Sequence, residues 1–370
     1  MAQARQTLDR LKQVDEVVDC DFHLTERQED LMPYLPDPWG KMFQRSLTED
    51  SEDYGVLGSF YPLPGSINTV TLGQADSDSV ASRAEVKAGM EKFHIDKAVT
   101  TPTLNLLLGA VRNEELAAAI ATAYNRWQDD KITAPDKGIY GTVLVSPQNA
   151  EKGAEEINKW ADDPGIVGVF VPPTGVVPFL GHPLYEPIYE AAEANGLPVF
   201  MHNSASTVMD SFPSMHRFLT RYFSIHTVSH PIQHMCNVTD IITRGLPVKY
   251  PDLNWVIQEA GIGYIPYLMN RMDHQYHQNT EDVPMLEKEP SEYLKDQFYF
   301  TSQPVEGAEH PEYVQDMVKH MGGDQALMFS SDYPHFDFDN TDELMKLLSS
   351  FDEDEINNIY GQNALDLLPF

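Results

Sequence analysis

The chain has 370 residues, 42% of them hydrophobic, and its 57 acidic residues against 25 Lys and Arg give a formal net charge of −32. A surface of that sign repels phosphate groups and anionic lipids, so we expect neither nucleic acid nor a membrane as partner. No apolar run reaches the roughly 18 to 20 residues that cross a bilayer, and the N-terminal stretch MAQARQTLDRLKQVDE lacks the apolar core of a signal peptide.

Cysteine usage and charge distribution also indicate the cellular compartment of the protein and the salt concentration around it. Cys20 and Cys236 are the only cysteines, which is too few for a disulfide framework and typical of a reducing compartment. We therefore expect a soluble, cytoplasmic protein. The acidic residues are spread along the whole chain, which favours adaptation to high salt, where counterions screen self-repulsion. An ordinary acidic cytosolic enzyme is the alternative interpretation.

Short apolar runs alternate with helical segments along the chain. The runs are apolar on both faces, as is typical of parallel strands that helices cover on both sides. We expect strands at residues 17–22, 96–103, 138–146, 166–173, 197–203, 253–260, 297–303 and 326–332.

Two of the segments between these runs carry clear helix signals. Residues 113–128 begin with Asn113 as an N-cap, followed by acidic residues and several alanines. Residues 183–196 end on Gly196, as a helix C-terminus commonly does. Eight strands that alternate with helices predict a single, distorted (β/α)8 TIM barrel, because parallel strands need helical crossovers.

Two longer segments depart from this alternation. Residues 35–80 are rich in Gly, Pro, Ser and Asp and follow neither a helix nor a strand period. We interpret them as an insertion after the first strand that forms a lid over the barrel mouth. Residues 204–250 are expected to be largely helical and contain several histidines.

The first predicted strand ends in the sequence VVDCDFH, which carries Asp21 and His23. Residues two apart on a strand point to the same side, so both side chains would face the barrel mouth, where active sites of this fold lie. Asp19 shares that side but lies deeper. The Asp-x-His pair alone is equally compatible with a metal ligand pair and with a polar strand end.

Two other strand ends favour the metal-ligand interpretation over that of a polar strand end. His202 closes LPVFMH, and Asp332 closes ALMFSSD. Taken singly, each has an ordinary interpretation, as a hydrogen-bonded histidine and as a helix cap. Three strands that present carboxylate and imidazole groups at the same end of a barrel together predict a site for a divalent metal such as Zn²⁺, Mn²⁺ or Fe²⁺.

The chain resembles the amidohydrolase superfamily, in the amidohydrolase-2 branch that includes aminocarboxymuconate semialdehyde decarboxylase and the resorcylate and carboxyvanillate decarboxylases. The resemblance covers nearly the whole chain, and its most specific parts are the fifth-strand histidine and the eighth-strand "SDYPH". The matching stretches are VVDCDFHLTE, GIVGVFVPPT, GLPVFMHNS, RGLPVKYPDLNWVIQEAGIGYIPYLMNRMD, LMFSSDYPH and EDEINNIYGQNALDLL.

The resemblance implies one bound divalent metal ion, held by Asp21, His23, His202 and Asp332. The first of these positions is often His in the family, and Asp there favours a harder ion such as Mn²⁺. A histidine that acts in proton transfer often ends the sixth-strand segment, where this chain has Glu259. A buried Glu can serve as acid or base or contact the metal, and a helix cap is its structural alternative.

Further polar residues have open roles. His335 is expected to line the site and contact substrate, or to fix its loop. His226, His230 and His234 share one helical face, a spacing compatible with a metal site but more typical of a half-exposed helix face. The resemblance places His230 in a segment over the barrel mouth, with a catalytic role. Arg221 and Arg271 are candidates for pairing with a substrate carboxylate, against the alternative of surface salt bridges.

Three hypotheses follow from these residues. The first is a metal-dependent carboxy-lyase for a small aromatic or unsaturated carboxylic acid, with Asp332 or Glu259 moving the proton that replaces CO₂. The second is a hydrolase of an amide, ester or lactone that uses a metal-bound water, with Asp332 as base. The third is a barrel without chemistry that serves as a scaffold. By analogy with the family we also expect a homodimer.

Overall fold

The computed structural model describes residues 14–46, 79–204, 221–307 and 310–370. Eight strands form one sheet in which each strand pairs with the next along the chain, and every pairing is parallel. The strands are β1 (Val18–Leu24), β2 (Lys97–Pro102), β3 (Ile139–Leu144), β4 (Ile166–Val171), β5 (Val199–His202), β6 (Trp255–Gln258), β7 (Phe298–Thr301) and β8 (Leu327–Met328).

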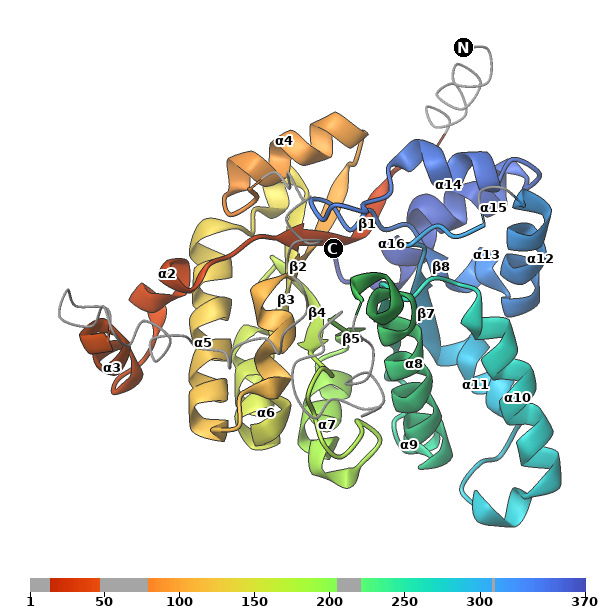
Figure 1. Ribbon diagram of the computed structural model, residues 1–370, viewed down its shortest axis with the longest axis horizontal. Coiled ribbons are helices and arrows are strands. Elements are labelled where there is room, and N and C mark those ends of the chain that lie inside the picture. Colours follow the sequence, from red (N-terminus) through yellow and green to blue (C-terminus); the bar gives the residue numbers. More distant parts are fainter. Residues whose placement is uncertain (1–13, 47–78, 205–220, 308–309) are drawn as a thin grey trace.

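Helices connect the strands and lie around the outside of the sheet, as Figure 1 shows for α5, α6 and α7. They are α2 (Gln28–Leu31), α3 (Trp39–Ser46), α4 (Arg83–Phe93), α5 (Glu114–Lys131), α6 (Ala150–Trp160), α7 (Glu186–Ala194), α8 (Tyr222–Thr243), α9 (Leu246–Lys249), α10 (Tyr264–Gln278), α11 (Pro290–Gln297), α12 (Pro311–Met321), α13 (Gly323–Ala326), α14 (Thr341–Leu347), α15 (Glu353–Asn357) and α16 (Asn363–Leu367).

Hydrogen bonds between β1 and the chain just after β8 bring the two ends of the sheet together. The Cys20 N–H donates to the Phe329 carbonyl over 3.0 Å, and the Asp332 N–H donates to the Asp21 carbonyl over 2.9 Å. The His23 N–H donates to the Tyr333 carbonyl over 2.8 Å. The expected (β/α)8 barrel is therefore confirmed, and its junction places the loop after β8 against the end of β1.

The strands are buried along almost their whole length, because the sheet packs its inner side on itself and its outer side on helices. Large apolar side chains fill these contacts; the rings of Trp255 on β6 and Phe298 on β7, for example, stack with centroids 5.0 Å apart. Among the described residues, no helix is long and apolar enough to span a membrane.

The observed helices and strands agree with some of the sequence-based predictions and differ from others. Asn113 is the N-cap of α5, and its side chain accepts a hydrogen bond from Leu116 N over 2.9 Å. The last predicted strand, 326–332, is shortened to two residues in β8 because the chain then turns towards β1. Residues 35–80 were expected to hold no helix, which is wrong for α3, while most of this predicted lid lies outside the described residues.

Candidate metal centre

Asp21 and His23 lie at the end of β1 and are completely buried. Their side chains point to the same side, as the two-residue spacing on a strand requires. His23 Nε2 lies 3.4 Å from Asp21 Oδ1 and 3.1 Å from His202 Nε2, which comes from the end of β5. His202 Nε2 in turn lies 3.4 Å from Asp21 Oδ2. The structure thus brings two imidazoles and a carboxylate together where β1 and β5 end.

Asp332 joins this group from the loop after β8. Its backbone has a φ of 60°, a left-handed conformation that a residue other than Gly rarely adopts and that costs on the order of 1–3 kcal/mol. The conformation directs the carboxylate back towards β1, where Asp332 Oδ1 lies 3.1 Å from His23 Nε2. Gln303 Nε2 donates to Asp332 Oδ2 over 3.3 Å and holds the other oxygen.

The outer nitrogens of the two imidazoles are both engaged. His202 Nδ1 donates to the Asn203 carbonyl over 2.7 Å, and His23 Nδ1 lies 3.1 Å from Thr103 Oγ1. Because a carbonyl only accepts, Nδ1 of His202 carries a proton, and Nε2 is the nitrogen that faces the cluster. Outer hydrogen bonds of this kind orient metal-binding histidines and fix their tautomer.

The donor set fits a divalent metal ion. Asp21 Oδ2 is buried and makes no hydrogen bond among the described residues, although buried carboxylate oxygens nearly always have a partner. Potential ligand atoms of Asp21, His23 and His202 lie within 4.8 Å of one another, and Asp332 Oδ1 approaches the same His23 nitrogen. Mixed carboxylate and imidazole ligands suit Zn²⁺, Mn²⁺ or Fe²⁺.

Electrostatics at the centre favour the arrival of a cation. Burial, together with the neighbouring carboxylates of Asp332 and Glu259, raises the pKa of Asp21 to about 8, although His202 opposes the rise. Burial lowers the pKa of His202, but Asp21 and Glu259 outweigh it and raise that pKa to about 9. Burial holds the pKa of His23 well below its usual range. Asp21 therefore retains a proton at neutral pH, which a metal ion would displace.

Glu259 reaches the centre by an unusual backbone route. Its neighbour Gln258 points into the barrel, where Gln258 Nε2 donates to Asp21 Oδ1 over 3.0 Å. Strict alternation would turn Glu259 away from Asp21, but a φ of 47° reverses its direction. As a result Glu259 Oε2 lies 2.8 Å from His202 Nε2, and Glu259 Oε1 lies 3.5 Å from His230 Nε2.

Nearby carboxylates affect the pKa values of His230 and His335, the two imidazoles that flank the centre, differently. Burial raises the pKa of Glu259, but His230 and His202 outweigh it and lower that pKa to about 2. Burial lowers the pKa of His230 to about 4 despite the opposing charge of Glu259. His335 differs from His230, because Asp332 overcomes the effect of burial and raises the pKa of His335 to about 9.

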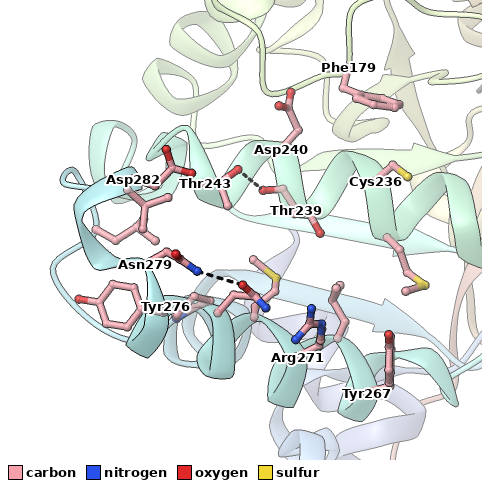
Figure 2. Close-up of a pocket in the computed structure, with 17 residues that line it drawn as sticks. Phe179, Cys236, Thr239, Asp240, Thr243, Tyr267, Arg271, Tyr276, Asn279 and Asp282 are labelled. Atoms are coloured by element: carbon pink, nitrogen blue, oxygen red, sulfur yellow. Dashed lines mark hydrogen bonds between the residues drawn. The ribbon is translucent and has the colours of Figure 1, made fainter.

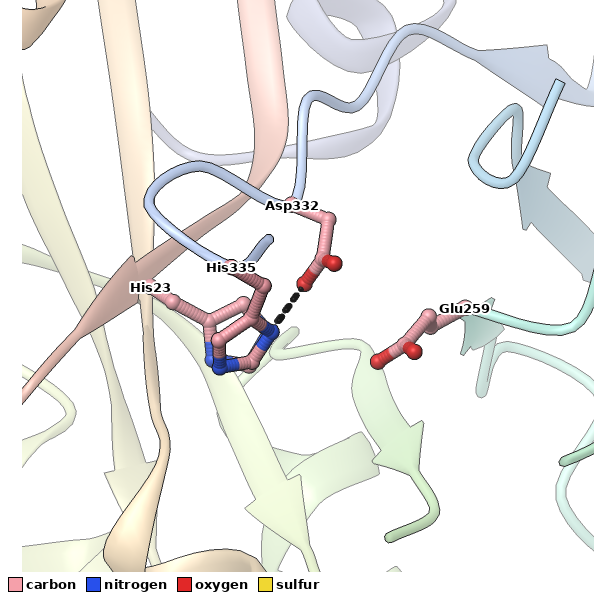
Figure 3. A group of neighbouring side chains, drawn as sticks. All are labelled: His23, Glu259, Asp332 and His335. Carbon is pink, nitrogen blue, oxygen red and sulfur yellow. Dashed lines mark hydrogen bonds and ion pairs between the residues drawn. The ribbon is translucent and has the colours of Figure 1, made fainter. Parts of the chain in front are cut away.

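His335 covers the centre from the loop after β8. Figure 3 shows its ring over that of His23, with Glu259 across from both; the two ring centroids are 4.1 Å apart. His335 Nδ1 lies 2.6 Å from Asp332 Oδ1, and His335 Nε2 lies 3.2 Å from Thr103 Oγ1. These contacts fix the His335 ring at the edge of the barrel mouth.

A cavity of about 210 Å³ opens beside the centre. Asn203, which directly follows His202, is buried there, and neither polar atom of its side chain has a partner among the described residues. Sequence analysis missed Asn203 and Thr103, and position directly after a strand end is the signal that would have found Asn203. The cavity is lined by Thr103, Leu106, Asn203, Ser204, His226, His230, Glu259, His335, Phe336 and Asp337.

Two of the predicted substrate contacts, Arg221 and Arg271, are not among the residues that line this cavity. Arg221 is the exposed N-cap residue of α8. Arg271 is exposed on α10 and lines a separate cavity of about 610 Å³ between α8 and α10, shown in Figure 2. The structure brings seven other predicted site residues together at the barrel mouth: Asp21, His23, His202, His230, Glu259, Asp332 and His335.

The fold and this donor set define a class of protein, the (β/α)8 barrels that hold a metal ion at the carboxyl ends of their strands. The profile of the amidohydrolase family, described as "Amidohydrolase", matches residues 18–370. The chain therefore belongs to this family, which confirms the resemblance noted in the sequence.

Several known proteins share this sequence pattern or fold. A 2-amino-3-carboxymuconate-6-semialdehyde decarboxylase of Dictyostelium discoideum is 21% identical over 269 residues, which span 72% of this chain and 71% of that protein. A 5-carboxyvanillate decarboxylase of Sphingomonas paucimobilis superposes with a TM-score of 0.72 at 20% identity, covering 95% of this chain and 98% of that one.

A third relative carries information on the metal. The 5-carboxyvanillate decarboxylase of Novosphingobium aromaticivorans superposes with a TM-score of 0.69 at 19% identity, covering 96% of each chain. It was crystallised with manganese and 4-hydroxy-3-methoxy-5-nitrobenzoic acid. At these identities the structural likeness establishes the fold of this chain, and its metal, substrate and oligomeric state are separate questions.

Proposed function

We propose that the protein is a metal-dependent carboxy-lyase that removes CO₂, without oxidation, from a small aromatic or unsaturated carboxylic acid. One observation carries the proposal: Asp21, His23, His202 and Asp332 converge beside a cavity of about 210 Å³ that also exposes imidazole and amide groups. The decarboxylase activity of the related proteins supports the choice of reaction.

A single divalent ion, Mn²⁺ or Zn²⁺, would be held by Asp21, His23, His202 and Asp332. When bound, the metal supplies a positive charge that draws off the electron density released as the C–C bond breaks. The chain orients the substrate. Asn203 offers an amide that has no partner among the described residues to a polar substituent, and Leu106 and Phe336 provide apolar contact for a ring.

Loss of CO₂ leaves an electron pair on carbon, and a proton must replace the carboxylate there. We assign this proton to the pair formed by His335 and Asp332. Asp332 Oδ1 holds the Nδ1 proton of His335 at 2.6 Å, so the Nε2 proton is the one that the His335 imidazolium can release. Thr103 Oγ1 accepts from this nitrogen over 3.2 Å and keeps it at the cavity wall.

The proposal is tested by loading the purified protein with Mn²⁺ or Zn²⁺ and supplying a panel of hydroxylated benzoic acids and unsaturated dicarboxylic acids. We expect CO₂ release and, in D₂O, one deuterium at the carbon that carried the carboxylate. The hydrolase alternative would be indicated by consumption of esters, lactones or amides without CO₂ release from any member of the panel. That outcome would overturn the carboxy-lyase assignment while leaving the metal centre in place.

A further inference from the structure

Glu26 is a buried residue in the chain between β1 and α2, and it is not among the residues that line the cavity at the barrel mouth. Both of its carboxyl oxygens accept hydrogen bonds from the loop after β2. Oε2 accepts from the Thr103 N–H over 3.1 Å, and Oε1 accepts from the Asn105 N–H over 3.0 Å and from Asn105 Nδ2 over 2.8 Å. One side chain therefore fastens the loop after β2 to the chain after β1.

Thr103, whose backbone Glu26 holds, lies between two imidazoles of the metal centre. Its Oγ1 lies 3.1 Å from His23 Nδ1 and 3.2 Å from His335 Nε2. The two rings come from distant parts of the chain and lie over one another, with centroids 4.1 Å apart (Figure 3). Because one hydroxyl group contacts both rings, a displacement of Thr103 would change the orientation of a metal ligand and of the proposed proton donor together.

The directions of these hydrogen bonds follow from what each ring contacts on its other side. His23 Nε2 faces the other potential ligands of the metal centre, so the proton of a metal-binding His23 is on Nδ1 and is donated to Thr103. In the proposed reaction the His335 imidazolium carries a proton on Nε2, which Thr103 also accepts. A threonine hydroxyl accepts two hydrogen bonds and donates one, so the two imidazoles leave Thr103 its own proton to donate.

The cavity is where the Thr103 hydroxyl proton can be used. Among the described residues this proton has no acceptor, and Thr103 lines the cavity. No Lys or Arg is among the lining residues in the described part of the chain, so the protein itself offers an anionic oxygen there only neutral donors and imidazole groups. Hydrogen bonds to ionised oxygens are stronger than those between neutral groups, which suits the Thr103 hydroxyl to an oxygen of a bound carboxylic acid.

We propose that Glu26 is a positioning residue of the reaction. By holding the Thr103 N–H, it places the Thr103 hydroxyl so that this group orients His23 and His335 and donates its proton to an oxygen of the substrate. Glu26 itself touches neither the substrate nor the metal. The substrate contact rests on the proposed function, whereas the effect of Glu26 on the two imidazoles does not depend on the reaction.

Conservative variants separate this role from a purely structural one. Glu26→Gln keeps the shape of the side chain, but its amide nitrogen cannot accept from the N–H groups of Thr103 or Asn105, so at least one of the three hydrogen bonds is lost. Glu26→Asp, which keeps the carboxyl group and shortens its reach, takes its place if Glu26→Gln does not fold. Thr103→Val removes the hydroxyl and keeps a β-branched side chain. Glu29→Gln is the matched control, since it makes the same chemical change at an exposed position on α2.

The first readout is the nitrogen NMR spectrum of the imidazoles in the full-length protein, recorded without metal and with Zn²⁺. We expect Thr103→Val and Glu26→Gln to shift the resonances of His23 Nδ1 and His335 Nε2, because both variants disturb the same hydroxyl contact. His277, an exposed histidine on α10, should keep its resonances, and the matched control should leave every resonance in place. Unchanged His23 and His335 resonances in Thr103→Val, or in a folded Glu26 variant, would overturn the inference.

Steady-state kinetics provide the second readout. Thr103→Val and Glu26→Gln should each lower kcat/KM by about tenfold or more. The double variant should lower it no further than the larger single effect, because both changes remove one shared contact. Multiplicative effects of the two variants would overturn the route through Thr103. Shifted resonances without CO₂ release from any acid tested would overturn the proposed reaction alone, and CO₂ release with unshifted resonances would overturn this inference alone.

Discussion

The two cavities of this barrel differ both in volume and in the kinds of side chain around them, and the larger one is not the one with potential metal ligands beside it. The cavity between α8 and α10 is larger, about 610 Å³, and its lining includes Tyr267, Leu268 and Arg271, of which Tyr267 and Arg271 are exposed. The cavity at the barrel mouth is about 210 Å³, yet buried carboxylates and imidazoles from β1, β5, β6 and the loop after β8 converge beside it. Ligand groups that come from separate strands, rather than a large volume, therefore mark the candidate functional site.

The largest expected effect is the loss of the metal centre. His202→Ala removes the imidazole that faces both His23 and Asp21. We expect the bound metal to fall from about one tight equivalent to below a tenth, and CO₂ release to fall by about 10³-fold or more. Elemental mass spectrometry and a CO₂ assay measure both quantities. A variant that keeps its metal would show that this cluster is not the site.

A smaller effect is expected for the proton donor. His335→Asn removes the imidazole held by Asp332 and should lower CO₂ release by about 10²–10⁴-fold while leaving the tight metal equivalent in place. The split between activity and metal content distinguishes His335 from the ligands. His277→Ala serves as the control for replacing a histidine. Unchanged CO₂ release in His335→Asn would move the proton role to another group.

The mouth also carries a buried acid that affects stability. Burial raises the pKa of Glu26 from 4.5 to about 7, although N–H groups of Asn105 and Thr103 oppose the rise. Because the folded state binds this proton more tightly than the unfolded chain, the contribution of Glu26 to stability is full below pH 4.5 and is lost as the pH rises through about 7.

Urea unfolding at several pH values tests this contribution. Between pH values of about 5 and 8, the free energy of unfolding of the wild type should fall by up to about 3 kcal/mol more than that of Glu26→Gln. Glu29→Gln changes an exposed neighbour and should follow the wild type. Parallel curves for the wild type and Glu26→Gln would contradict the raised pKa.

The smallest expected effect belongs to the larger cavity. Arg271 lies on α10, outside the barrel mouth, so Arg271→Ala should leave CO₂ release and KM within about twofold of the wild type. Steady-state kinetics measure this directly. A rise of tenfold or more in KM would restore Arg271 as a substrate contact and would make the α8–α10 cavity part of the functional site.

Local sequence patterns were sufficient to predict much of the barrel and the direction of several of its site residues. The two-residue spacing of Asp21 and His23 places both side chains on one side of a strand, and the apolar run that ends at His202 places its imidazole at the same end of the barrel. The capping role of Asn113 also follows from local chemistry. The (β/α)8 architecture follows from the alternation of buried strands and helices.

Other features depend on contacts between distant segments. Alternation along β6 would direct Glu259 away from Gln258's side of the strand, and only the left-handed backbone turns it to the metal centre. Thr103 lies between His23 and His335 because β2 pairs with β1 and the loop after β8 folds over both. Periodicity carries no information on either contact.

The sequence by itself determined the number and order of the strands and the ligand types at their ends, because side-chain period and burial are local properties of the chain. The tertiary structure decided that His226, His230, Glu259 and Asp337 face one another and that Arg271 does not join them. These placements depend on how the barrel closes and how α8 lies against its mouth. Such contacts between distant segments cannot be predicted from the sequence of any one segment.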